Sequence, residues 1–351
     1  MLYAYILSGE KKEAGGGIYS FAVSGDGKLT PASYLALPCA MYAAVSDGDI
    51  YVVCRGTGDG LDRFGRKADS AVTRVPLLES GRFGEPSPFY PTEGVTGCHI
   101  DILKEPGGVK RLFTANYSSA LISRLSPDGD GFRCDAAVVH AAPDETHGRF
   151  DRRAYLHQSC LSPDGRFVAA VDLGRDEVVV YDTGLGFVSA CRLAPGTGPR
   201  HIIFNGGDAY TVNELTSTVS RYKWDAGAGK LTFIENYDLL PEGSTAEYRL
   251  ACSGAAIRVC DGNLYASVRL DESVTVFRIN GDGSLTWLQY VKCGGSWPRD
   301  INLTPDGRYL YSANERENTV TAFSRSYDGR LSAMGAQASV PAPNDIVFAG
   351  V

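Results

Sequence analysis

Apolar and polar residues alternate along most of the chain in short runs that are separated by glycine-containing turns. A run of this kind, followed by a turn and a further apolar residue, occurs seven times, for example as SVTVFRINGDGSL at 273–285 and NTVTAFSRSYDGRL at 318–331. A period of two residues is typical of a half-buried strand. Asp-Gly between two such runs is a strong signal for a β-hairpin. The pattern therefore predicts an all-β chain of repeated hairpins.

A second pattern lies between those copies and consists of a strand, a turn and a strand that ends in a polar group. It has six complete copies, such as GPRHIIFNGGDAYTVNEL at 198–215, and a seventh divided between NDIVFAGV at 344–351 and LYAYILSG at 2–9. These repeats predict a single domain, residues 1–351, folded as a seven-bladed β-propeller with four-stranded blades. Pairing of the N- and C-terminal strands would close the ring and protect a sheet edge. A stack of separate β-sandwiches would not explain the divided repeat.

The ends of these hairpins carry most of the candidate chemistry. An antiparallel hairpin places the start of its first strand beside the end of its second. In a propeller the inner hairpins all present these ends to one mouth of the central channel, and a mouth ringed by Arg, His and Glu suits a small anionic ligand. The polar residues at these positions are Arg55, His99, Asn116, His157, Asp172, Arg200, His201, Glu214, Arg269, Arg299, Asn314 and Glu315.

Several of these residues also have a purely structural interpretation. Arg299 and Glu315 could pair with each other, and Asn116 could cap a loop by binding backbone amides. His99 follows a cysteine at a strand start and could be a core histidine, and Arg55 borders a glycine-rich loop and could be an exposed charge. A second group comes from three consecutive inner hairpins and is expected to share one functional role. Its members are His157, Arg200, Glu214 and Arg269.

Composition and charge exclude several functional classes. The formal net charge is -7 and no basic stripe is present, so nucleic acid is not an expected partner. No stretch approaches the roughly 20 apolar residues that cross a bilayer, and the N-terminus does not have the charge order of a signal peptide. The nine cysteines form no C-x-x-C pair and are interpreted as reduced core residues of a cytoplasmic protein. The oligomeric state is left open.

No motif for a bound cofactor is present in the sequence. The five histidines show no metal-ligand spacing, and neither a dinucleotide fingerprint, a phosphate-binding loop nor a serine-hydrolase elbow occurs. The sequence therefore predicts a site without metal or cofactor. The polar segment at 138–155, which contains His140 and His147, is expected to be a loop that flanks the mouth or a solvated linker.

Several runs resemble the bacterial lactonase family of seven-bladed propellers, which includes propeller-type 6-phosphogluconolactonases and fungal carboxy-muconate lactonizing enzymes. The resemblance implies a funnel-shaped site, no cofactor and hydrolysis of 6-phosphogluconolactone. It implies His157, Arg200, Glu214 and Arg269 as the catalytic positions; the expected substrate-binding residues around them are His99, Asn116, His201, Arg299 and Glu315. The runs that carry the resemblance are 115–117, 157–181, 198–222, 273–285 and 297–314.

The chain departs from the family pattern at four places near the expected mouth. Tyr155 and Arg258 stand where the family often has histidine, Ala256 where it often has glutamate, and Glu315 where it often has glutamine. These changes leave the substrate open. A lactonizing cycloisomerase acting on a muconate would need the same arginine anchors, and a non-catalytic ligand-binding propeller could have the same fold.

Overall fold

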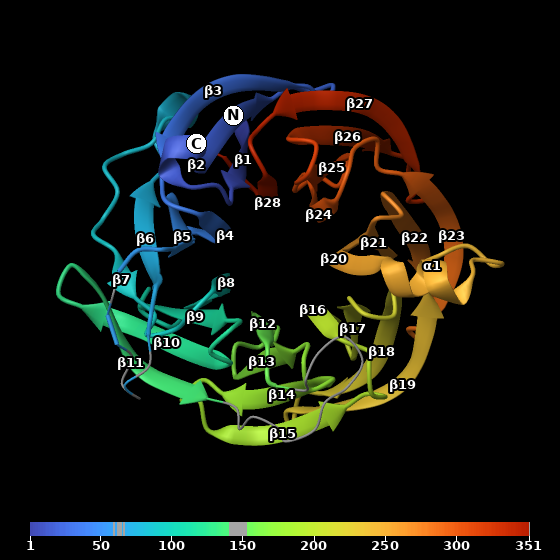
Figure 1. Ribbon diagram of the computed structural model, residues 1–351, viewed down its shortest axis with the longest axis horizontal. Helices are drawn as coiled ribbons and strands as arrows, with labels where there is room; N and C mark the ends of the chain where they lie inside the picture. Colours follow the sequence, from blue (N-terminus) through green and yellow to red (C-terminus); the bar gives the residue numbers. More distant parts are fainter. Residues whose placement is uncertain (59, 62–64, 66, 140–152, 351) are drawn as a thin grey trace.

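The computed structural model describes residues 1–351 except 59, 62–64, 66, 140–152 and 351. The described residues form seven antiparallel four-stranded sheets arranged around a common axis (Figure 1). The predicted seven-bladed β-propeller is therefore confirmed. Most of the polar segment at 138–155, including His140 and His147, lies outside the described residues.

Each blade runs from an inner strand beside the axis to an outer strand at the rim (Figure 1). The inner strands are β4 (Ala40–Ser46), β8 (Gly97–Lys104), β12 (Leu156–Leu161), β16 (Pro199–Asn205), β20 (Ser253–Cys260), β24 (Pro298–Leu303) and β28 (Pro343–Gly350). The second strands are β1 (Leu2–Ser8), β5 (Asp49–Arg55), β9 (Lys110–Asn116), β13 (Phe167–Asp172), β17 (Asp208–Asn213), β21 (Asn263–Arg269) and β25 (Tyr309–Asn314).

The outer half of each blade follows the same order. The third strands are β2 (Gly17–Val23), β6 (Ser70–Pro76), β10 (Leu121–Asp128), β14 (Glu177–Asp182), β18 (Thr218–Asp225), β22 (Ser273–Ile279) and β26 (Thr319–Arg325). The outermost are β3 (Leu29–Ala36), β7 (Tyr90–Pro91), β11 (Gly131–Val139), β15 (Phe187–Arg192), β19 (Lys230–Asp238), β23 (Leu285–Lys292) and β27 (Leu331–Ser339). Short helical turns cover Lys12–Ala14, Glu79–Gly81 and, as α1, Ala246–Ala251. No helix in the described chain is long and apolar enough to span a membrane.

The two ends of the chain meet in one blade. β28 is the inner strand of this blade and pairs antiparallel with β1, with Tyr5 opposite Val347 and Ile6 opposite Ile346. Figure 1 shows both termini at this blade, where the first and last colours of the chain lie side by side. The divided repeat therefore supplies the last pairing of the ring, as the sequence predicted.

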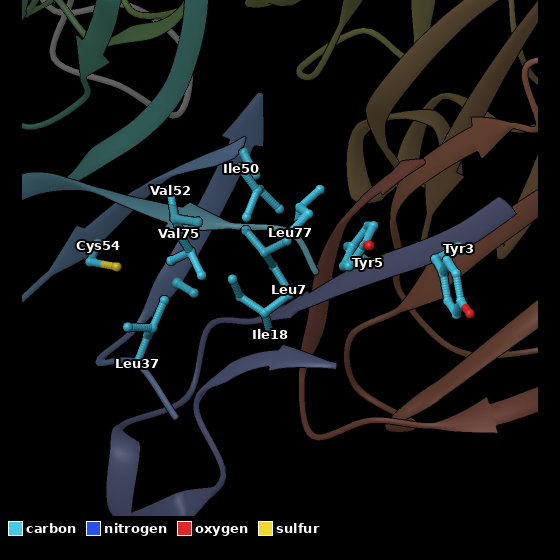
Figure 2. Packing of buried hydrophobic residues seen from close by; sticks show 12 residues of the cluster. Tyr3, Tyr5, Leu7, Ile18, Leu37, Ile50, Val52, Cys54, Val75 and Leu77 are labelled. Carbon is cyan, nitrogen blue, oxygen red and sulfur yellow. The ribbon is translucent and has the colours of Figure 1, made fainter. Parts of the chain in front are cut away.

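Apolar side chains fill the spaces between neighbouring blades. Leu7 and Ile18, from the blade that joins the termini, pack against Ile50, Val52 and Val75 of the next blade (Figure 2). All five side chains are fully buried. Burial of apolar surface stabilises the fold by about 25 cal/mol per Å², and the same kind of cluster recurs between the other blades. The nine cysteines are unpaired, and most of them are buried.

A shift of register near the start of the first strand recurs in every inner hairpin. In the hairpin of β16 and β17, Pro199 is opposite Asn213 and His201 is opposite Val212, so Arg200 has no partner in the ladder. A bulge of this kind turns the extra side chain away from its regular direction. The unpaired positions at this end of the seven hairpins are Met41, Cys98, His157, Arg200, Ala255 with Ala256, Arg299 and Asn344.

Candidate functional site

A cavity of about 230 Å³ lies where the bulged positions meet the ends of the second strands. It brings together all four residues that the sequence grouped as catalytic, and it contains four guanidinium groups. The lining residues are Arg55, Thr96, Cys98, Tyr117, His157, Arg200, Glu214, Arg269 and Arg299. A polar cavity with this many cations is suited to an anionic ligand.

Glu214 forms two ion pairs inside the cavity. Its Oε2 atom lies 2.7 Å from Nη2 of Arg269 and 3.3 Å from Nε of Arg200. Burial by itself would raise the pKa of Glu214, but Arg269 and Arg200 outweigh burial, so its pKa lies below the usual value. The carboxylate is therefore ionised at neutral pH. Both contacts end on Oε2, and no hydrogen bond from a described residue reaches Oε1.

Arg200 is almost completely buried, with 2% of its surface exposed. Its Nη1 atom donates to the carbonyl oxygen of Ala255 at 2.5 Å and lies 3.3 Å from Nε2 of His201. Burial, together with Arg269 and Arg299, lowers the pKa of Arg200 to about 9. The guanidinium remains charged at neutral pH and is held rigidly by its contacts with the neighbouring blade.

His157 contributes an uncharged imidazole to the cavity. Burial lowers its pKa well below the usual value, and the nearby Arg200 and Arg299 lower it further. Its Nδ1 atom is buried and has no hydrogen-bond partner among the described residues. The ring of Tyr117 meets His157 edge-on at 5.8 Å and stacks on Tyr155 at 4.9 Å, measured between centroids. Tyr155, one of the departures from the family pattern, thus supports the cavity wall.

His99 and His201, both expected to bind substrate, are buried and do not line the cavity. The ring centroid of His201 is 5.1 Å from that of His157 and 5.8 Å from that of His99. His99 also contacts the side-chain amide of Gln158 at 3.1 Å and packs on Tyr42, 4.0 Å between centroids. These two histidines form a buried layer that connects neighbouring inner strands.

Two further predicted substrate-binding residues are engaged with the fold. Asn116 is fully buried and does not line the cavity; its Nδ2 atom donates to the carbonyl of Leu121 and to Ser123 within its own blade. Glu315 does not line the cavity either and pairs with Arg299 at 3.2 Å. Arg299 itself does line the cavity and also forms the expected ion pair with Glu315, and its role in substrate binding stays a prediction.

Sequence reasoning had noted Arg55 only as a rim candidate and had missed Thr96, Cys98 and Tyr117. Tyr117 directly follows Asn116, just as Glu214 directly follows Asn213, so the position after the end of the second strand was the available signal. Cys98 occupies the bulged position of its hairpin. Burial raises the pKa of its thiol to about 11, which makes it a neutral lining group and a poor nucleophile.

None of the four departures from the family pattern lines the cavity. Ala256 is buried in the core, and Arg258 pairs with the buried Asp300 at 2.8 Å. A larger hollow of about 890 Å³ lies between Lys104 and Arg166, at the opposite ends of the inner strands, and its charged lining residues are of both signs, in contrast to the four arginines of the cavity. Within the described residues, no cluster of three His, Cys, Asp or Glu side chains could hold a metal ion.

Comparison with known proteins identifies the relatives of this chain. A family model described as Lactonase, 7-bladed beta-propeller, matches residues 4–348. An uncharacterized protein of Staphylococcus saprophyticus is 31% identical over 335 residues, covering 92% of this chain and 91% of the relative.

Solved structures match over the full length of the chain. A candidate 6-phosphogluconolactonase from Bacteroides fragilis has a TM-score of 0.82 at 25% identity, covering 99% of this chain and 98% of that one. The periplasmic gluconolactonase PpgL of Pseudomonas aeruginosa has a TM-score of 0.84 at 24% identity and 100% coverage of both chains.

Proposed function

Because the chain belongs to the lactonase family of seven-bladed β-propellers, we propose that it is a carboxylic ester hydrolase that opens a small anionic sugar lactone. The leading substrate is 6-phosphogluconolactone, which would yield 6-phosphogluconate. The observation that carries the proposal is the ionised Glu214, paired with Arg200 and Arg269 beside the neutral His157 in a cationic cavity. The Bacteroides fragilis and Pseudomonas aeruginosa neighbours are described as acting on related sugar lactones.

Glu214 is the proposed general base. Its Oε2 is fixed by two arginines, so Oε1 is the oxygen available to a water molecule. The water oxygen attacks the lactone carbonyl carbon as Oε1 accepts a proton, and the ring C–O bond then breaks as that proton passes to the departing alkoxide. A positioned acid–base group contributes roughly 10²–10⁴-fold to the rate.

The arginines would stabilise the charge that develops on the carbonyl oxygen. Arg200 and Arg269 are held in place by backbone carbonyls of the neighbouring strand β20, at Ala255 and Gly254. Fixed cations need no reorganisation during the reaction, which makes them effective for an oxyanion. The neutral His157 would orient the attacking water, and no cofactor is required for this chemistry.

Binding of an anionic substrate would also change the pKa values of Glu214 and His157. The arginines lower the pKa of both Glu214 and His157 in the free protein. A bound phosphate or carboxylate offsets that positive field, which raises both pKa values and strengthens the base when substrate is present. The site is therefore better matched to a charged lactone than to a neutral one.

The test is hydrolysis of freshly generated 6-phosphogluconolactone, followed by base uptake at constant pH. Turnover should exceed the spontaneous rate and should be lost in Arg200→Ala. Arg330→Gln, a half-exposed arginine on an outer turn, serves as the matched control. A rate equal to the spontaneous one in the wild-type protein would overturn the proposal. The cytoplasmic location inferred from the cysteines stays a prediction.

A further inference from the structure

Arg55 differs from the other arginines of the cavity because it forms no ion pair with a described residue. Arg200 and Arg269 share Glu214, and Arg299 pairs with Glu315. No carboxylate of a described residue lies within ion-pair distance of Arg55. Among the described residues, the one hydrogen bond of its guanidinium runs from Nε to the carbonyl oxygen of Gly97 in the neighbouring blade, at 2.8 Å.

The hydrogen bond of Arg55 determines which part of its guanidinium remains available. Because Nε is occupied by Gly97, the two terminal nitrogens are left as a pair of donors. Two parallel N–H donors on one planar group match two oxygens of a phosphate or carboxylate. Burial and the nearby Arg299 lower the pKa of Arg55, although Cys98 and Asp69 oppose them, and no ion pair with a described residue compensates this cation. An uncompensated cation in a cavity is stabilised by an anionic ligand.

The arginines of the cavity come from blades on both sides of the axis. Arg55 ends β5 and Arg299 lies in the bulge of β24, and these strands flank the blade that joins the termini (Figure 1). Arg200 and Glu214 belong to the hairpin of β16 and β17, which lies across the axis from that blade (Figure 1). A ligand that spans the cavity would therefore place one end near Arg55 and Arg299 and the other near Glu214.

We propose that Arg55, together with Arg299, forms the subsite that binds the phosphoryl group of the substrate. Arg200 and Arg269, which hold Glu214, are then left to act on the lactone carbonyl. This assignment rests on the proposed lactonase function and makes Arg55 a specificity-determining residue for phosphorylated over unphosphorylated lactones.

The first experiment compares two substrates, 6-phosphogluconolactone and glucono-δ-lactone. In Arg55→Gln, the ratio of their kcat/KM values should fall by about 10- to 100-fold, through a higher KM for the phosphorylated lactone. Arg55→Lys, which keeps the charge but loses the paired donors, should recover part of that ratio. A ratio that stays unchanged, or an equal loss on both lactones, would overturn the assignment.

The second experiment does not depend on catalysis. Inorganic phosphate should raise the Tm of the wild-type protein and of Arg330→Gln, and this rise should be lost in Arg55→Gln. If the wild-type protein opens no lactone, the proposed function fails, yet the phosphate measurement still decides the subsite. Phosphate that stabilises Arg55→Gln as strongly as wild type, or that does not stabilise wild type at all, would refute it.

Discussion

Nε of Arg200 lies 3.3 Å from Oε2 of Glu214, and the two residues come from opposite strands of one β-hairpin. The hairpin brings them to the same mouth, and Arg269 of the next blade completes the group at 2.7 Å from the same oxygen. A carboxylate held in this way is at once a fixed proton acceptor and the counter-charge that keeps two buried cations in place.

Glu214→Gln should abolish lactone hydrolysis, with a loss of about 10²–10⁴-fold, because the amide cannot accept the proton of the attacking water. The fold should persist, since glutamine retains the shape of the side chain, although two arginines lose their counter-charge. Hydrolysis at constant pH and thermal unfolding of the same sample measure both effects. Arg330→Gln, on an outer turn away from the cavity, is the control. Turnover near the wild-type level in a folded Glu214→Gln protein would remove Glu214 from the chemistry.

The pH profile should reflect the lowered pKa of Glu214. Since this pKa is lower in the folded chain than in the unfolded one, ionisation of Glu214 stabilises the fold above the unfolded value of about 4.3. That contribution disappears as the pH falls through the folded pKa. The value of kcat/KM reports the ionisation of groups in the free enzyme. It should therefore stay constant from neutral pH down to about 4.3. A decline centred between pH 6 and 7 would contradict Glu214 as the general base.

The fold and the four grouped residues of the cavity could be predicted because both depend on local properties. Alternation of apolar residues indicates strands, and the ends of a hairpin always meet. His99 shows the limit of that reasoning. His99 and His157 both lie near the start of an inner strand. In the hairpin of His157 the histidine itself is the bulged residue, but in the hairpin of His99 the bulged residue is Cys98. A shift of one residue along a strand turns the side chain to the other face.

Asn116 and Arg55 show that sequence position alone does not determine which side chain of a second strand reaches the cavity. The residue that ends β9 is held inside the blade, and the following Tyr117 reaches the cavity. The side chain of Arg55 is held at the cavity by its hydrogen bond to the carbonyl oxygen of Gly97 in the neighbouring blade. A contact between two blades cannot be recognised from the sequence of either segment alone. The sharing of one carboxylate oxygen by two arginines likewise depends on distances between blades.

Asp172→Asn should stabilise the protein at alkaline pH. Asp172 is fully buried, its Oδ1 accepts hydrogen bonds from the backbone of Tyr155, Gly174 and Arg175, and burial raises its pKa to about 7. Because the folded chain binds this proton more tightly than the unfolded chain, stability falls as the pH rises from about 4 to 7.

Asparagine keeps the accepting oxygen of Asp172 without the charge, and it is the residue at the corresponding strand ends Asn116, Asn213 and Asn314. The gain in unfolding free energy at pH 8 should be on the order of 1–3 kcal/mol and should vanish near pH 4. Urea unfolding of both proteins at the two pH values measures it. A gain that is equal at both values would contradict the ionisation argument.

Removal of residues 344–351 should destroy cooperative unfolding. The deletion takes away nearly all of β28, the inner strand of the blade that joins the termini, and exposes the whole edge of β1. Calorimetry should show a broad transition at a lower temperature than in the full-length chain. Ile346→Ala, which only creates a cavity at a fully buried site, should cost about 2–5 kcal/mol and keep a single sharp transition. A truncated chain that melts like the parent would contradict closure through this strand.

The bulges of the inner hairpins separate the requirements of strand pairing from the requirements of the site at the mouth. A residue that is skipped by the ladder has no cross-strand neighbour to match, so its identity is free of the constraints that strand pairing imposes. Methionine, cysteine, histidine, arginine, alanine and asparagine all occupy these positions here, on hairpins of the same architecture. A propeller of this type can therefore exchange the reactive groups around its mouth by single substitutions, and new substrates can be acquired without refolding the scaffold.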